Sequence, residues 1–138
     1  MNTLILTVGL PRCGKSTWAK EQGIVVVNPD SIRLAIHGQR FDKEFENLVW
    51  YIAKVMVKSQ FEYGEDTIII DATNTTPFAR AQWKSNNWER KYKIFKPNPE
   101  ICCSRAVDTL QMDIIPIINK MYQQWDISNI APEDILED

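Results

Sequence analysis

The chain has 138 residues, of which 44% are hydrophobic and 25% are charged, and its formal net charge is −2. This length suits a single domain with a substantial core, the ordinary composition argues against extensive disorder, and the charge gives no global positive field for nucleic acid. No apolar run is long enough to span a bilayer, the N-terminus lacks signal-peptide features, and the three cysteines show no metal spacing, so we expect reduced thiols, a cytoplasmic location and no membrane partner.

The first part of the chain reads as a strand, a turn, a helix and a second strand. An apolar, β-rich run at residues 3–8 predicts a buried strand, and a helix is expected at residues 15–22 after a glycine-rich turn. A second buried strand is expected at residues 24–27. The sequence Asn-Pro-Asp follows it, which predicts that Asn28 caps a short helix ending at Gly38.

The middle of the chain predicts a long helix and a third strand. Residues 42–64 read as an amphipathic helix whose apolar residues recur at helical spacing, namely Phe45, Leu48, Val49, Ile52, Val55 and Met56. Residues 67–70 predict a third buried strand that ends in Asp71. A further helix is expected at residues 76–85.

The last part predicts one exposed strand and two helices. Residues 91–96 alternate apolar and basic side chains, which favours a strand with one exposed face. Two final helices are expected at residues 98–110 and 114–125. The five acids after them, with no base, predict a loose acidic tail, so we divide the chain into a domain at residues 1–125 and a tail at residues 126–138.

Strands that alternate with helices predict an α/β fold with three layers, in which helices cover a central parallel sheet of about four strands. Ligands of such sheets bind at the carboxyl ends of the strands. Three polar stretches fall at those ends, after Val8, Val27 and Ile70. Their coincidence is stronger support for a binding site than any of the three alone.

The turn after the first strand has the spacing of a phosphate-binding loop, with two glycines followed by a lysine and a hydroxyl. Gly9 and Gly14 allow backbone amides to converge on one point, and the following helix adds its positive end. Lys15 would reach the β- and γ-phosphates and Ser16 would bind Mg²⁺. The loop therefore predicts that ATP and Mg²⁺ are the cofactors, held by Gly9, Pro11, Arg12, Cys13, Gly14, Lys15, Ser16 and Thr17.

Asp71 is the expected partner of Ser16 in binding the metal. It ends the third strand, so its carboxylate should lie beside the phosphate loop and orient Mg²⁺ directly or through water. Many strands end in aspartate by chance, and only the neighbouring loop gives this residue its meaning.

Asp30 is the expected general base of a phosphoryl transfer. A phosphate loop alone does not distinguish a kinase from a GTPase or a motor, but no Asn-Lys-x-Asp element is present and motors are generally larger. Asp30 follows the second strand, and Arg33 lies on the same helix face three residues later, where it could grip a substrate phosphate. The alternative is structural: Asp30 complements the helix dipole and pairs with Arg33.

The basic residues and the tryptophans leave the partner open. Six bases and one acid lie between Arg80 and Lys96, which indicates either a surface for a polyanion or an ordinary solvated edge. The chain has five tryptophans, and Trp83 or Trp88 could stack on bases, although core packing is the alternative for both. Trp50 is expected in the core.

The sequences GLPRCGKSTWAK, NPDSIR and DATNTTPFARAQW, in this order, resemble the kinase domain of phage polynucleotide 5′-hydroxyl kinases and the zeta-toxin-like and AAA_33-type small kinases around them. The resemblance implies a P-loop kinase fold. It also implies that Lys15 and Ser16 bind ATP and Mg²⁺, that Asp30 is the general base and that Arg33 binds the acceptor. Candidate substrate-binding residues in the third sequence are Thr73, Asn74 and Arg80.

The chain departs from that family in the loop and in the lid helix. Small residues usually stand where Arg12 and Cys13 do, and the lid helix usually carries two arginines four positions apart. Arg105 matches the first lid arginine as a catalytic residue, but Thr109 occupies the second position. The clamp on the transferred phosphate could therefore come from Arg105, Arg12 or Lys120, or be weak.

The resemblance extends to phage kinases that phosphorylate 5-hydroxymethyluracil within DNA, where the base would have to be flipped out. The leading expectation is thus an ATP-dependent kinase that phosphorylates a hydroxyl on nucleic acid, most simply DNA, in the host cytoplasm if the chain is phage-encoded. The alternatives are a small-metabolite or nucleoside kinase and a nucleotide-binding switch without transfer. The sequence leaves the oligomeric state open.

Overall fold

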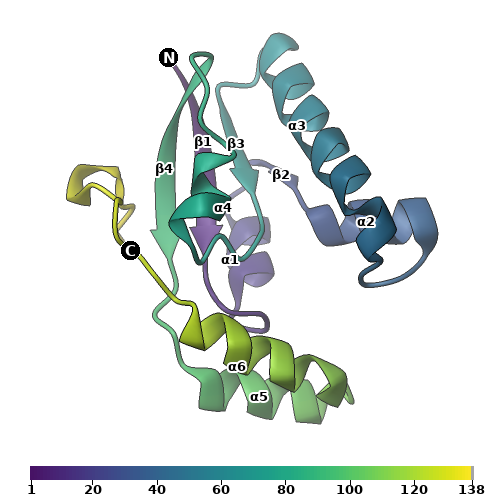
Figure 1. Cartoon of the computed structure of the whole chain (residues 1–138). Helices are drawn as coiled ribbons and strands as arrows, with labels where there is room; N and C mark the ends of the chain where they lie inside the picture. Colours follow the sequence, from purple (N-terminus) through teal and green to yellow (C-terminus); the bar gives the residue numbers. More distant parts are fainter. Residues whose placement is uncertain (138) are drawn as a thin grey trace.

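A parallel sheet of four strands is the centre of the computed structural model, which describes residues 1–137 (Figure 1). The strands are β1 (Asn2–Val8), β2 (Val25–Val27), β3 (Thr67–Ile70) and β4 (Trp88–Ile94), in the spatial order β2-β3-β1-β4. This arrangement confirms the predicted α/β fold and its parallel sheet. Each crossover between parallel strands requires a connection across a face of the sheet, which the intervening helices provide.

The register of the strands aligns their carboxyl ends. Val27 of β2 pairs with Ile70 of β3, and Ile70 pairs with Leu6 of β1. The residues that follow these strands therefore emerge at one edge of the sheet, which is where an open parallel sheet binds its ligands.

Helices cover both faces of the sheet and its carboxyl edge (Figure 1). One core cluster joins the sheet to α3, and another joins the opposite face to α1. A third cluster joins the loop after β1 to α5 and α6, which lie together beyond the carboxyl edge. The helices are α1 (Lys15–Glu21), α2 (Pro29–His37), α3 (Glu46–Glu62), α4 (Pro77–Ala81), α5 (Pro99–Asp108) and α6 (Ile115–Gln123), with 3₁₀ turns at Lys43–Phe45, Met112–Ile114 and Pro132–Asp134.

The buried face of α3 differs from the predicted one. A stripe with a spacing of four residues faces the core, consisting of Val49, Ala53, Val57 and Phe61. Of the residues predicted for that face, Ile52 is half-buried and four are exposed, namely Phe45, Leu48, Val55 and Met56. The small side chain of Ala53 lets the helix approach the sheet closely, a preference that apolar spacing alone does not reveal.

Two elements in the second half also differ in extent. The last strand begins at Trp88 rather than Lys91, because all seven residues of β4 pair with β1. The helix expected at residues 76–85 ends at Ala81, and Trp83 just after it is buried.

Within the described part of the predicted tail, residues 126–137, several residues bond to the domain, so this part is not loose as its charge predicts; Asp138 lies outside the described residues. Leu136 donates a 2.8 Å backbone hydrogen bond to Tyr92, and Ile135 forms a parallel bridge with Tyr92. Asp126 donates its backbone N–H to the carbonyl of Thr75 at 2.9 Å. This segment thus runs against the outer edge of β4.

Among the helices of residues 1–137, none combines the length and the apolar character that crossing a lipid bilayer requires.

Candidate nucleotide and acceptor site

The loop between β1 and α1 has the backbone shape of an anion cradle. Gly14 has a φ of 101° and Arg12 a φ of 66°, both in the left-handed region. A Cβ atom on Gly9 would lie 2.5 Å from the Cys13 sulfur and 3.1 Å from Phe95 Cβ, so no larger residue fits there without rearrangement. The two glycines therefore allow a tight turn around a small volume, as a phosphate site requires.

Within residues 1–137, two cationic side chains of this loop form no ion pair with a carboxylate. Lys15 is buried, and its Nζ donates to the carbonyl of Leu10 at 2.7 Å and approaches the Cys13 sulfur at 3.7 Å. The Nε of Arg12 is buried and has no hydrogen-bond partner within residues 1–137. A buried donor without a partner is costly, and an anion would satisfy it. The residues present therefore fit a polyphosphate.

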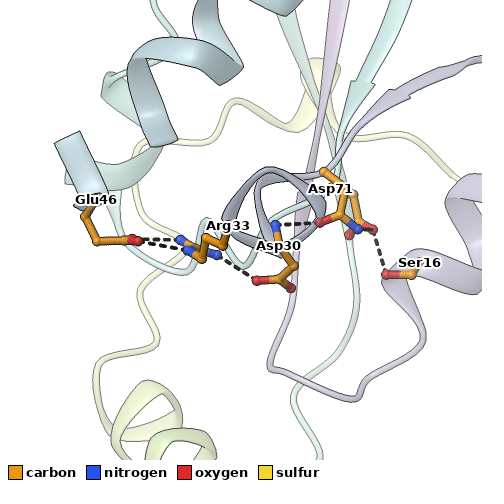
Figure 2. Close-up of polar contacts among 6 residues, drawn as sticks. Ser16, Asp30, Arg33, Glu46 and Asp71 are labelled. Carbon is orange, nitrogen blue, oxygen red and sulfur yellow. Dashed lines mark hydrogen bonds and ion pairs between the residues drawn. The ribbon is translucent and has the colours of Figure 1, made fainter. Parts of the chain in front are cut away.

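Ser16 and Asp71 meet at the edge of the sheet, as predicted (Figure 2). The Ser16 hydroxyl donates a 2.6 Å hydrogen bond to Oδ2 of Asp71, whose side chain is buried. The side-chain amide of Asn28 donates to the same oxygen at 3.3 Å. A hydroxyl beside a buried carboxylate is a suitable pair of oxygen donors for Mg²⁺, which prefers few protein ligands together with phosphate oxygens.

Asp30 is the second residue of α2, and its carboxylate is 70% exposed. Arg33 donates from Nη1 to Asp30 at 2.6 Å and from Nε and Nη2 to the two oxygens of Glu46 at 2.9 and 2.8 Å (Figure 2). The guanidinium also lies 5.8 Å from the centroid of the Trp50 ring. Burial by itself lowers the pKa of Arg33, but the bonds and charges of Glu46 and Asp30 outweigh it and leave the pKa raised.

The contacts of Arg33 suggest a second role beside the predicted one, which stays a prediction. An arginine that binds an acceptor phosphate should present free donors, whereas this one gives bonds to two carboxylates. In this structure Arg33 contacts the carboxylate of Asp30, while Glu46 of α3 holds the guanidinium in place. Sequence reasoning missed Glu46, and nothing in its local pattern sets it apart from the other acids nearby.

Arg105 reaches the phosphate loop from α5. Its Nη1 donates to the carbonyl of Arg12 at 2.9 Å and lies 4.0 Å from the position of a Cβ on Gly14. Arg105 therefore lies beside the predicted phosphate loop, and its role toward the phosphates stays a prediction. Thr109 instead bonds its own helix through the Arg105 carbonyl at 2.9 Å, and Lys120 is exposed on α6.

Thr73 and Asn74 support the loop through the backbone. The carbonyl of Thr73 accepts from the Gly9 N–H at 2.9 Å, and the Asn74 side chain donates to the Thr7 carbonyl at 3.0 Å. Asn74 is buried and has a φ of 45°, a conformation that asparagine tolerates well. Both residues therefore fix the start of the phosphate loop relative to β3.

Arg80 is buried and anchors backbone, which argues against its predicted role in binding substrate. Its guanidinium donates to the carbonyls of Asn74, Asp126 and Ser128 at 3.0, 2.9 and 2.9 Å. Burial lowers its pKa, and the charges of Tyr92 and Asp126 partly offset this effect. Arg80 thus links α4 to the C-terminal segment by hydrogen bonds.

The basic residues of β4 do not share one face of the sheet. Successive residues of a strand point to opposite faces, so the bases of β4 are divided between the two sides of the sheet. Lys93 is buried near the rings of Trp18 and Phe95, and Lys91 pairs with Asp134 at 3.2 Å. β4 alone therefore presents no continuous basic face, but Arg80, Lys84 and Arg90 line one cavity, and the surface for a polyanion stays a prediction.

The tryptophans proposed to stack on bases are in the core. Trp83 is 1% exposed and packs edge to face against Trp50, and Trp88 is 9% exposed and stacks on Phe61. Neither ring can contact a nucleic-acid base without unfolding its surroundings. The alternative of core packing is confirmed for both, while Trp50 is only half-buried.

Comparison with known proteins gives a family and several solved structures of the same fold. The sequence model of the AAA domain family (AAA_33) matches residues 4–108. A chain of the Pnkp1/Rnl/Hen1 complex aligns at TM-score 0.67 and 25% identity, over 75% of this chain and 38% of that one. A chain of the Pnkp1/Rnl/Hen1 RNA repair complex aligns at TM-score 0.68 and 17% identity, over 99% and 50%.

A third structure is a gluconokinase from Sinorhizobium meliloti 1021, which aligns at TM-score 0.61 and 10% identity, over 97% of this chain and 80% of that one. The chain thus spans half or less of the two repair-complex chains and most of the gluconokinase. At these identities the gluconokinase and the second repair-complex chain share the fold alone.

Proposed function

Because the chain belongs to the AAA domain family (AAA_33) and is a P-loop small kinase, we propose that it transfers the γ-phosphate of ATP to a hydroxyl group on nucleic acid. The observation that carries this proposal is the position of Asp30, an exposed carboxylate at the same sheet edge as the phosphate loop. The likeness to chains of the Pnkp1/Rnl/Hen1 complex, which one of the two structures names an RNA repair complex, supports a nucleic-acid acceptor. A free 5′-hydroxyl end is the leading acceptor, and the hydroxymethyl group of 5-hydroxymethyluracil in DNA is the other.

The residues of the site have separate tasks in this reaction. The loop amides and Lys15 bind the β- and γ-phosphates, and Arg105 and Arg12 neutralise charge that develops on the transferred group. Asp30, oriented by Arg33, accepts the proton of the attacking hydroxyl. Most of the acceleration then comes from holding the hydroxyl and the phosphorus in line.

Ser16 and Asp71 are the residues that would hold Mg²⁺. The ion, when bound, would neutralise charge on the phosphate oxygens and help to orient them. Ser16 would give up its bond to Asp71 to do so, and the buried carboxylate would remain nearby to orient metal-bound water.

One assay tests the proposal. Radiolabelled ATP is offered with a 5′-hydroxyl oligonucleotide of DNA or RNA, with DNA that contains 5-hydroxymethyluracil, and with free nucleosides. We expect label on one nucleic acid, its loss in Lys15→Ala together with nucleotide affinity, and its loss in Asp30→Asn with nucleotide affinity kept. Turnover retained by Asp30→Asn would refute the role of Asp30 as base.

A small hydroxyl compound is the second candidate acceptor. The division of the basic residues between two faces of β4 favours it, because β4 alone then offers no continuous basic face to a polyanion. Label transfer to a nucleoside or a sugar, but not to any oligonucleotide, would identify this alternative. Nucleotide binding without transfer to any acceptor would leave a nucleotide-binding switch.

A further inference from the structure

Asn28 contacts both acidic residues of the candidate site, the backbone of Asp30 and the carboxylate of Asp71. It lies between β2 and α2, and its two side-chain polar atoms make different contacts. Oδ1 accepts the backbone N–H of Asp30 at 2.8 Å, and Nδ2 donates to Oδ2 of Asp71 at 3.3 Å. One side chain thus contacts the residue proposed as base and the residue proposed to support the metal.

Helix capping explains only half of this arrangement. A cap needs an oxygen that accepts a backbone N–H, and serine, threonine and aspartate supply one as well as asparagine does. Thr76 caps α4 in this way with a 3.2 Å bond. What asparagine adds is an N–H donor, and in Asn28 that donor is directed at Asp71.

The capping asparagine of α5 shows the difference. Asn98 accepts the N–H of Ile101 at 3.1 Å, and within residues 1–137 its amide makes no bond to a carboxylate. Asn28 and Asn98 are therefore the same residue in the same capping role, and they differ in the contact with Asp71.

The hydrogen bonds of Asp71 indicate when this contact matters. Its Oδ2 accepts from both Ser16 and Asn28, and the side chain is only 6% exposed. If Ser16 turns to the metal, Asn28 is the remaining side-chain donor that fixes the carboxylate. An unrestrained carboxylate would no longer be aimed at the metal or its water.

We propose that Asn28 is a positioning residue that holds Asp71 in its metal-supporting orientation and keeps Asp30 at a fixed place relative to it. This inference rests on the proposed function. It assigns Asn28 no contact with substrate, and it predicts that loss of the amide donor weakens the use of Mg²⁺ without weakening the fold.

The test compares Asn28→Ser with Asn98→Ser. Both variants keep a capping oxygen, but only the first removes a donor to Asp71. Three quantities are measured: the urea midpoint, the affinity for an ATP analogue with and without Mg²⁺, and kcat and KM with the Mg²⁺ concentration at half-maximal rate. For Asn28→Ser we expect an unchanged metal-free affinity, and a loss of about 10-fold or more in kcat and in Mg²⁺ affinity, as residues behind metal ligands commonly show.

A second variant, Asn28→Asp, tests whether the effect comes from the contact with Asp71 rather than from the helix cap. Asn28→Asp also keeps the cap, but it places a carboxylate against Asp71, so the loss should exceed that of Asn28→Ser. A role limited to helix capping does not predict this order, because both variants keep the capping oxygen.

The outcomes separate the inference from the function on which it rests. Asn28→Ser that matches Asn98→Ser in kcat and in the Mg²⁺ dependence of analogue binding would overturn the inference, even with an active wild-type enzyme. A wild-type protein that binds the analogue but transfers phosphate to no acceptor would contradict the proposed function. The Mg²⁺ dependence of binding would then still decide the role of Asn28.

Discussion

Arg33 of α2 and Glu46 of α3 form a two-point ion pair, with Nε and Nη2 of the guanidinium 2.9 and 2.8 Å from the two carboxylate oxygens. The side chains are 14% and 19% exposed, so the pair is largely shielded from water. The remaining Nη1 is directed at Asp30 at 2.6 Å. The position of the proposed base therefore depends on a helix that does not carry it.

Glu46→Gln tests this dependence. The substitution keeps the shape of the side chain but leaves a shielded guanidinium with one carboxylate, so we expect a loss of about 1–3 kcal/mol in the free energy of unfolding. Arg33 would then bond more fully to the Asp30 carboxylate, which would hinder Asp30 from accepting a proton. The substitution should therefore lower kcat more than it raises KM. Urea denaturation and steady-state kinetics measure both effects. Glu44→Gln, an exposed acid two residues earlier, is the matched control, and equal behaviour of the two variants would contradict the prediction.

Alkylation of Cys13 should report nucleotide binding. Its sulfur lies against Gly9 and 3.7 Å from Lys15 Nζ, inside the cradle that the phosphates would fill. We expect ATP to slow the reaction of Cys13 with N-ethylmaleimide. Peptide mass spectrometry measures the extent of this reaction. Cys103 provides an internal reference because it is half-buried on α5 and contacts Asn119 instead.

Cys102 should stay unmodified in the same experiment. Its side chain is 1% exposed, and burial raises the pKa of its thiol above the ordinary value, with a smaller contribution from the neighbouring Cys13. The reactive thiolate is therefore scarce at neutral pH. Protection of Cys13 and Cys103 to the same degree would indicate a general tightening of the protein rather than occupation of the cradle.

Arg80→Met should lower stability and leave substrate affinity unchanged. It removes the donor to three backbone carbonyls, those of Asn74, Asp126 and Ser128, and we expect a loss of about 2–4 kcal/mol in the free energy of unfolding. The C-terminal segment should also become sensitive to limited proteolysis. Lys84 is an exposed base four residues after Arg80, and Lys84→Met should change neither measurement. A raised KM in a fully stable Arg80→Met protein would restore the original assignment to the substrate.

Acid should weaken the same segment through Asp126. The hydrogen bonds from Ser128 lower the pKa of Asp126, and the charge of Arg80 acts in the same direction. A carboxylate whose pKa is lower in the folded state stabilises the fold above its unfolded pKa of about 3.9 and loses that effect as the pH falls through the folded value. The difference in urea midpoint between wild type and Asp126→Asn should therefore be present at pH 7 and vanish in acid. A difference that grows toward low pH would show that the sign is wrong.

Local signals predicted the sheet and the phosphate loop well. The strand at residues 67–70 was predicted with its observed bounds, because a short β-branched run between polar residues is unambiguous. The loop spacing likewise placed Lys15, Ser16 and Asp71 together, since the carboxyl ends of parallel strands share one edge. These features depend on neighbours in sequence and on a general rule of topology.

The errors concern contacts between distant segments. Glu46 bonds to Arg33 because α3 packs on α2. Arg80 bonds to the carbonyls of Asp126 and Ser128, which lie more than forty residues later in the sequence. The face of α3 was misjudged for the same reason, because the sheet selects Ala53 and Val57 rather than the larger apolar residues. The sequence around a charged or apolar residue does not reveal which distant residue it will contact in the fold.

The contact between Leu136 and Tyr92 has a consequence for solubility. β4 is the outer strand of the sheet, and an uncovered edge of seven residues offers its free N–H and C=O groups to a strand of another molecule. The hydrogen bond from Leu136 and the bridge at Ile135 occupy part of that edge. Removing the last few residues would thus expose a template for intermolecular strand pairing, and the damage would appear as aggregation during expression before any change in turnover.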